Sequence, residues 1–207
     1  MALPALATVD DLEAAGVSSS PAAMELALRR ASARVRAHTR QDFTFEAGDT
    51  VLLRGGERVL VLPQRPVVVD DAHPLAVVEL IDMAGVEVPA VEGRDFTRVG
   101  CELTRGYPFE APGRSMGWPW SRTLGVWADR VRVVYSHGYA EVPDDIADIV
   151  LDLATTNLTN PNGLRSETVG GESVTYASET IGNAKLTRQH KEDLRLYRRA
   201  AFSVVAS

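Results

Sequence analysis

Hydrophobic residues recur at helical spacing in three segments of the chain. The longest segment follows Ser20 and Pro21, a pair typical of a helix start, and predicts a helix over residues 21–41. A second helix is expected over 143–158, and a third begins after Thr187. Their buried stripes are Met24, Ala27, Leu28, Ala31, Val35 and His38 in the first, Ile146, Ile149, Val150, Leu153 and Asn157 in the second, and His190, Leu194, Tyr197 and Ala201 in the third.

A shorter helix is expected near the N-terminus. Thr8 can cap it, and Asp10 and Asp11 in its first turn lie at the positive end of the helix dipole. Gly16 ends it. The pattern therefore predicts about four helices.

Between the two longest helices, residues 43–135 change to short β-prone runs separated by turns. Gly55-Gly56-Glu57 is typical of a hairpin and predicts that the first two runs pair with each other. Regularly spaced turns between short strands indicate a small antiparallel barrel or sandwich. The runs are residues 50–53, 58–62, 67–69, 76–82, 87–91, 96–104 and 126–135.

This order of elements predicts an α+β fold, in which one β region is inserted into a helical core. The helical core is expected over residues 1–42 and 136–164, and the inserted β-subdomain over 43–135. Residues 165–207 are expected to hold a hairpin about Gly170-Gly171 and then a helical arm.

Composition narrows the function. The 207 residues are 45% hydrophobic and 24% charged, which is typical of a globular protein. The net charge of −6 disfavours sequence-specific binding to nucleic acid, since an acidic surface repels phosphates. Neither a signal peptide nor a membrane-spanning run is expected, and Cys101, the single cysteine, excludes an internal disulfide.

One motif is typical of a hydrolase. Gly113-Arg114-Ser115-Met116-Gly117 matches G-x-S-x-G, in which a strand precedes the serine and a helix follows it. Here Pro112 precedes the motif and Trp118-Pro119-Trp120 follows it, so the sequence favours a loop over a nucleophile elbow. A small serine hydrolase using Ser115 is retained as the alternative from a different functional class.

The sequence predicts neither a metal nor a cofactor. The histidines His38, His73, His137 and His190 lack the spacing of a zinc helix, and no CxxC motif is present. The aspartates near residue 148 lack the alternation and glycine turn of a calcium loop. Three tryptophans, Trp118, Trp120 and Trp127, serve either as core packing or as contacts to a partner.

Three motifs occur in order along the chain: Leu62-Pro63 with Pro66-Val67; Val133–Tyr139 leading into Val142–Ile146; and Asn160-Pro161-x-Gly163 with Ser166-Glu167 and Ser173–Tyr176. Together with the arginine-bearing first long helix, they resemble the head-to-tail connector (adaptor) proteins of long-tailed bacteriophages. The resemblance covers most of the chain, but the stretch from Gly106 to Gly125 matches no pattern of that family.

The resemblance implies a structural virion protein with no enzymatic activity and no cofactor. Proteins of that family form a ring, usually of twelve subunits, beneath the portal protein. A stopper or tail-completion protein binds below, and DNA passes through the lumen without specific binding. The expected location is the neck of the virion at the head-tail interface, after synthesis in the host cytoplasm. A stopper or tail-terminator connector protein is the alternative within this class.

The resemblance also suggests roles for the charged segments. Family members dock on the portal through their C-terminal segments, which implies that role here for Lys185, Arg188, Lys191, Leu194, Arg195, Tyr197 and Arg198. A solvated amphipathic helix is the simpler interpretation of the same pattern. Trp118 and Trp120 are possible contacts to a partner.

Charge complementarity offers a way to close such a ring. Arg29, Arg30 or Arg34 of one subunit can face Asp144, Asp148 or Asp152 of its neighbour. Alternatively, these aspartates line the lumen, where an acidic wall lets DNA slide without adhering. A solvated helix face is the third interpretation of the same aspartates.

Overall fold

The computed structural model describes residues 3–81, 86–106, 125–159, 166–169, 172–175 and 185–198, with the backbone alone for 166–169 and 172–175. Its contacts divide the chain into two units. The helical unit comprises Met1–Thr44 and Tyr139–Arg199, and the β unit comprises Phe45–Gly138. The β unit is therefore an insertion within the sequence of the helical unit.

The described part of the helical unit contains four α-helices, as the sequence predicts. They are α1 (Val9–Ala14), α2 (Pro21–Thr39), α3 (Asp144–Thr159) and α4 (Arg188–Asp193), the last followed by a 3-10 turn over Leu194–Leu196. The three predicted caps are present, because the Thr8, Ser20 and Thr187 side chains each accept a backbone N–H of the first helical turn.

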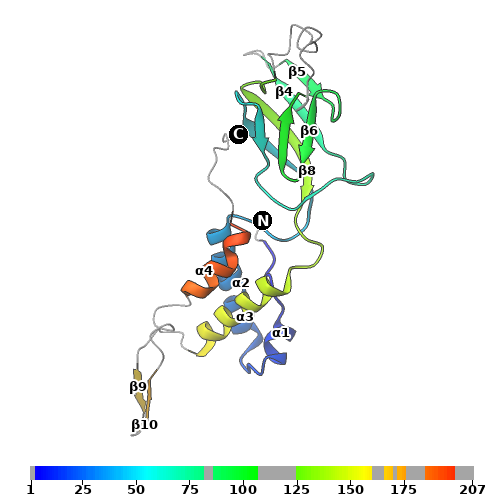
Figure 1. Ribbon diagram of the computed structural model, residues 1–207. Coiled ribbons are helices and arrows are strands. Elements are labelled where there is room, and N and C mark those ends of the chain that lie inside the picture. Colours follow the sequence, from blue (N-terminus) through cyan, green and yellow to red (C-terminus); the bar gives the residue numbers. More distant parts are fainter. Residues whose placement is uncertain are drawn as a thin grey trace. The chain divides into compact units, whose positions relative to one another are not determined.

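Two of these helices, α2 and α3, lie side by side and supply most of the helical core (Figure 1). Their buried stripes are those predicted from the 3.6-residue period, except that His38 and Asn157 are only half-buried. The other core residues come from the N-terminal segment, from α1, from the chain after α2 and from the 3-10 turn: Leu6, Ala7, Leu12, Phe43 and Leu194.

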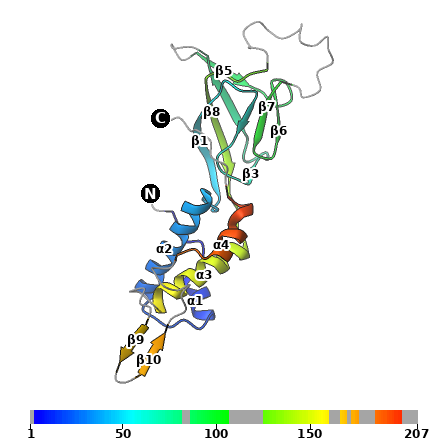
Figure 2. The ribbon, with the colours of Figure 1, turned by 60° about the vertical axis from the view of Figure 1, so that its left-hand side comes forward.

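The expected C-terminal hairpin is also present. Strands β9 (Ser166–Val169) and β10 (Glu172–Thr175) pair antiparallel, with Glu172 opposite Val169 (Figure 2). Gly170 and Gly171, which the sequence places in its turn, lie outside the described residues.

The described part of the β unit contains two antiparallel sheets. One has the order β1-β8-β4-β5, with β3 also paired to β8, and the other has the order β2-β7-β6. The strands are β1 (Glu46–Arg54), β2 (Val59–Val61), β3 (Val67–Val68), β4 (Ala76–Leu80), β5 (Glu87–Ala90), β6 (Phe96–Val99), β7 (Glu102–Arg105) and β8 (Arg130–His137).

Both sheets contribute to one core. Val133 and Tyr135 of β8 and Val77 of β4 meet Leu103 of β7 and Phe96 of β6 in a single buried cluster. The α+β class with an inserted antiparallel β region is confirmed, and its β part consists of two sheets around a common interior.

Two predicted strand features are wrong. The Gly55-Gly56-Glu57 turn does not form a hairpin, because β1 pairs with β8 and β2 pairs with β7 of the other sheet. The N–H groups of Gly55 and Gly56 instead bind the carbonyls of Asp129 and Trp127. A side chain at Gly55 would place its Cβ 1.8 Å from the Ala128 carbonyl oxygen, so the close backbone approach requires glycine.

The run 96–104 is likewise two strands rather than one. Gly100, with a φ of 59°, turns the chain between β6 and β7, which then pair with each other. A β-branched residue at position 100 would be strained, because such residues rarely adopt a positive φ.

Candidate interaction surfaces

No cluster of side chains suited to metal binding occurs among the described residues. Ser115, Trp118 and Trp120 lie outside the described residues. Trp127 is a core residue: its ring is buried, and its Nε1–H donates to the Leu103 carbonyl at 3.1 Å. No helix in the described ranges combines the length and apolar character that a membrane crossing requires.

The predicted acidic face of α3 divides into two parts. Asp144 and Asp148 share a side of the helix with Ala147 and Leu151, and all four line one open groove. Asp152 instead lies on the side that faces α4, where its Oδ2 is 3.3 Å from Nε2 of His190. The sequence treats these aspartates as one stripe, but the structure gives them different neighbours.

The acidic groove, as we call it, has a volume of about 610 Å³ and lies within the helical unit. One wall is the N-terminal segment with the start of α1, and the other is the start of α3 with the residues before it. Its carboxylates come from Asp11, Glu141, Asp144 and Asp148, all of them exposed residues. The remaining lining is Ala5, Leu6, Ala7, Thr8, Val142, Ala147 and Leu151.

Hydrogen bonds to α2 hold the first wall of the acidic groove in place. The buried Ser32 hydroxyl accepts the Leu6 N–H at 2.9 Å and donates to the Leu28 carbonyl at 2.7 Å. One turn further along α2, Arg36 donates through Nη2 to the Pro4 carbonyl at 2.8 Å. Burial lowers the pKa of Arg36, partly offset by Asp42.

A capping box holds Asp11 at the groove. One Asp11 oxygen accepts the Thr8 N–H at 2.8 Å and the Thr8 hydroxyl at 2.7 Å, while the Asp11 N–H donates to that hydroxyl. The Thr8 hydroxyl bond and then the backbone bond lower the pKa of Asp11. The groove therefore keeps this negative charge at neutral pH.

The arginine face, as we call the exposed side of α2, lies opposite its buried stripe. Ala22, Leu26, Arg29, Ala33 and Ala37 recur every three or four residues on this side, Arg30 adjoins them, and Arg40 follows the end of the helix. Arg29 and Arg30 are exposed, and Arg34, one turn beyond Arg30, is half-buried. Leu26, one turn before Arg29 and Arg30, is 40% exposed, so the face combines positive charge with a small apolar strip.

The C-terminal helix is packed onto the helical unit rather than standing apart from it. Leu194 is fully buried in the helical core, and the Tyr197 ring meets Phe43 edge to face at 5.6 Å between centroids. The Tyr197 hydroxyl donates to Asp145 of α3, at 2.8 Å from its Oδ2 atom. Of the seven residues expected to dock on a portal, these two therefore pack against the rest of the helical unit.

The remaining members of that set, Lys185, Arg188, Lys191, Arg195 and Arg198, are exposed. Arg195 Nη1 lies 3.0 Å from Oε1 of Glu192, and both side chains of this ion pair are exposed. Burial, and then the proximity of Arg198 and Lys191, lowers the pKa of His38 near the end of α2. Of these basic residues, Arg198 and Lys191 thus lie near the end of α2.

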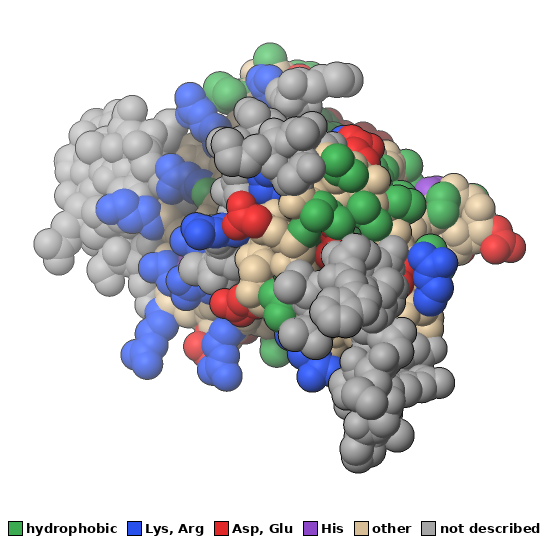
Figure 3. All heavy atoms as spheres, turned by 90° about the horizontal axis from the view of Figure 1, so that it is seen from above, with side chains coloured by type: hydrophobic (Ala, Val, Ile, Leu, Met, Phe, Trp, Pro, Cys, Tyr) green, Lys and Arg blue, Asp and Glu red, His purple; other side chains and the backbone are tan. Residues whose placement is uncertain are grey.

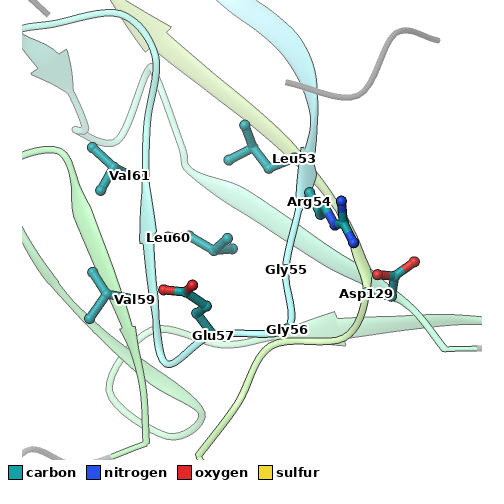
Figure 4. Close-up of a pocket in the computed structure, with 9 residues that line it drawn as sticks. All are labelled: Leu53, Arg54, Gly55, Gly56, Glu57, Val59, Leu60, Val61 and Asp129. Carbon is teal, nitrogen blue, oxygen red and sulfur yellow. The ribbon is translucent and has the colours of Figure 1, made fainter. Parts of the chain in front are cut away.

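The β unit has a second hollow, of about 620 Å³, along the chain from β1 to β2 (Figure 4). Leu53, Leu60, Val59 and Val61 supply its apolar lining, and Arg54, Glu57 and Asp129 its charges. Its described lining residues do not place a nucleophile beside a base. Hydrophobic side chains also reach the surface in Figure 3, consistent with exposed residues such as Val99 at 77%.

Sequence reasoning did not identify Asp11, Glu141 or Ser32 as parts of a shared surface. Asp11 is recognisable as a first-turn acid, but nothing local indicates that it lies beside a groove with Asp144. Ser32 is a polar residue inside an apolar stripe, and that is the signal by which its buried role could be suspected.

Comparison with known proteins identifies the fold. The chain aligns with a chain in the neck of an empty gene transfer agent particle, computed with C6 symmetry. The alignment covers 98% of this chain and 95% of that one, with a TM-score of 0.52 and 18% identity. A chain from the virion of a native gene transfer agent particle aligns over 91% of this chain and 83% of that one, with a TM-score of 0.46 and 21% identity.

No protein-family model matches the sequence, and no curated protein matches it. At this level of identity the structural match describes a shared fold. That fold extends over nearly the full length of both chains.

Proposed function

We propose that this chain is a structural subunit of the neck of a phage-like particle. In this proposal it forms a ring between the portal and the stopper or tail, and DNA passes through the ring. The observation that supports it most is the full-length fold match to a chain in a particle neck solved with C6 symmetry. A twelve-subunit ring is compatible with sixfold symmetry.

The surfaces of the helical unit support a role in assembly. A ring requires a heterologous interface, in which two different patches of one subunit fit each other. The acidic groove and the arginine face are two such patches with opposite charge. The net charge of −6 is compatible with a channel that does not retain DNA.

The exposed cations of the C-terminal helix are the proposed portal contact. Lys185, Arg188, Lys191 and Arg195 are all exposed, while Leu194 and Tyr197 hold the helix on the core. In this form of the proposal the helix presents its charges from a fixed position, which avoids the entropic cost of ordering a loose arm.

Mass measurement with and without the portal tests the proposal. The purified chain, mixed with the portal protein of its own particle, should give a complex in which a ring of this chain joins the portal, visible by negative-stain microscopy. Persistent monomers with no portal binding would contradict the proposal. Binding to tail-side proteins in the absence of portal binding would favour the stopper or tail-terminator alternative.

A further inference from the structure

We infer that the acidic groove of one subunit receives the arginine face of the next copy of this chain. The inference rests on the proposed ring and specifies the surfaces that close it. It differs from a simple pairing of charged helices, because only part of the acidic face of α3 takes part and the N-terminal segment contributes the rest.

The division of the α3 aspartates selects the residues. Asp152 lies beside His190 of α4, and Asp145 accepts the hydroxyl of Tyr197, which follows the 3-10 turn, so both have partners within the subunit. Asp144 and Asp148 face the acidic groove, where Asp11 and Glu141 add two further carboxylates. Among the described residues that line it, the groove thus holds four acidic residues and no Lys or Arg.

A partner that fits this groove carries positive charge for the carboxylates and a few small apolar side chains for the apolar lining. The arginine face has both, since Arg29 and Arg30 lie one turn beyond the exposed Leu26, and Ala22, Ala33 and Ala37 have short side chains. Arginine binds carboxylates through two parallel hydrogen bonds, which fixes orientation as well as strength. Leu26 would lie against the apolar lining, of which Val142 and Leu151 are parts.

A subunit cannot satisfy its own groove in this way. The buried stripe of α2 packs into the same core as that of α3, so the arginine face points away from α3. The two surfaces therefore remain for different neighbours, and repeated use of one contact gives a head-to-tail series that closes into a ring.

The receiving surface is fixed before binding. Ser32 and Arg36 bind the backbone of Leu6 and Pro4, and the Thr8–Asp11 capping box orders the start of α1. A wall that is already ordered loses little conformational entropy when a neighbour binds.

Charge reversal tests the inference in the full chain with its portal. Variant one carries Asp144→Arg and Asp148→Arg, variant two carries Arg29→Asp and Arg30→Asp, and variant three carries all four changes. The fraction of subunits in rings is measured by mass photometry. We expect the fraction of subunits in rings to fall about tenfold or more in variants one and two, and to recover most of its wild-type value in variant three.

Matched controls separate this contact from general charge effects. Asp71→Arg and Arg54→Asp reverse exposed charges of the β unit and should leave the ring fraction unchanged. Circular dichroism on each variant excludes unfolding, which matters because Asp144 also stabilises the first turn of α3.

The outcomes distinguish the inference from the proposed function. Normal rings in variant one or variant two would overturn the inference while leaving the ring itself intact, and would favour a lumenal place for Asp144 and Asp148. Loss in both variants without recovery in variant three would also overturn the pairing. Absence of rings in the wild-type chain with portal would instead contradict the proposed function.

Discussion

Arg105 and Glu79 form a buried ion pair that joins the two sheets of the β unit. Nη2 of Arg105, on β7, lies 2.8 Å from Oε2 of Glu79, on β4, and the two side chains are 2% and 4% exposed. Arg105 also donates to the Asp95 carbonyl and lies over the Trp127 ring at 5.1 Å, while Glu79 accepts the Ala128 N–H at 3.1 Å. The pair therefore has partners on every side.

Removing one member of this pair is expected to destabilise the β unit strongly. Glu79→Ala should lower the free energy of unfolding by about 3–5 kcal/mol, because it leaves the Arg105 charge buried without its partner. The double change Glu79→Leu with Arg105→Met should cost less than the sum of the two single changes, since no charge then remains inside. Urea unfolding followed by tryptophan fluorescence measures both.

A matched exposed pair serves as control. Arg132 and Glu87 lie 2.7 Å apart, with side chains 37% and 53% exposed. Glu87→Ala should cost no more than about 1 kcal/mol because solvent screens the pair. Equal losses of unfolding free energy in Glu79→Ala and Glu87→Ala would show that burial does not govern the contribution of Glu79 to stability.

The Ser32 hydroxyl is expected to stabilise the wall of the acidic groove. Ser32→Ala removes the acceptor of the Leu6 N–H in a buried position and should cost about 1–3 kcal/mol. Hydrogen exchange at the Leu6 amide should accelerate in this variant. Ser19→Ala, at an exposed position before the helix cap, should change neither quantity. An unchanged exchange rate at Leu6 in Ser32→Ala would contradict the assigned bond.

Tyr197 is expected to lose its proton at a higher pH than an ordinary tyrosine. Burial, and then its hydrogen bond to Asp145, raises the pKa of Tyr197 to about 12. The folded chain holds this proton more tightly than the unfolded chain, in which tyrosine titrates near pH 10. The associated stability is therefore fully present below about pH 10 and is lost as the pH rises from about 10 to about 12.

Ultraviolet titration of tyrosinate checks this behaviour. The difference between wild type and Tyr197→Phe isolates the group, and should show a single late-titrating phenol. Asp145→Asn should lower the pH at which that phenol titrates, because it removes the carboxylate that favours the neutral form. A difference curve centred near pH 10 would mean that Tyr197 does not contact α3 in this way.

Portal binding should depend on the exposed cations of the C-terminal helix. Replacing Lys185, Arg188, Lys191 and Arg195 with Gln should weaken portal binding by about tenfold and reduce its dependence on salt. Leu194 and Tyr197 stay in place in this variant, so the helical core remains intact. Deleting everything after Ala184 is a poorer test, because it also removes the buried Leu194.

The control for this experiment is Arg54→Gln with Arg58→Gln, which removes exposed cations outside the C-terminal helix. Binding to the portal, measured by surface plasmon resonance at two salt concentrations, should be unaffected by it. Equal losses in the control and the test variant would indicate that net charge, rather than this helix, determines binding.

Local structure was largely predictable from the sequence. The helix caps at Thr8, Ser20 and Thr187 are signalled by single residues, and the buried stripes of α2 and α3 follow from the 3.6-residue period. These features depend on residues that are close in the chain, so the sequence alone is enough to predict them.

Long-range pairing was not predictable in the same way. Gly55-Gly56 has the composition of a hairpin, but the chain crosses from one sheet to the other there because β1 finds its partner in β8. The α3 aspartates appear equivalent along the sequence, yet His190 and Tyr197 contact Asp152 and Asp145, while Asp144 and Asp148 line the groove beside the N-terminal segment. Partner choice across such separations depends on packing that no local pattern encodes.

The neck of purified particles that carry this gene offers the most direct measurement. A cryo-electron microscopy map should show a closed ring of this chain next to the portal, with α2 of each copy against the acidic groove of the next. Particles that lack the chain, or that hold it without forming a closed ring, would contradict the account.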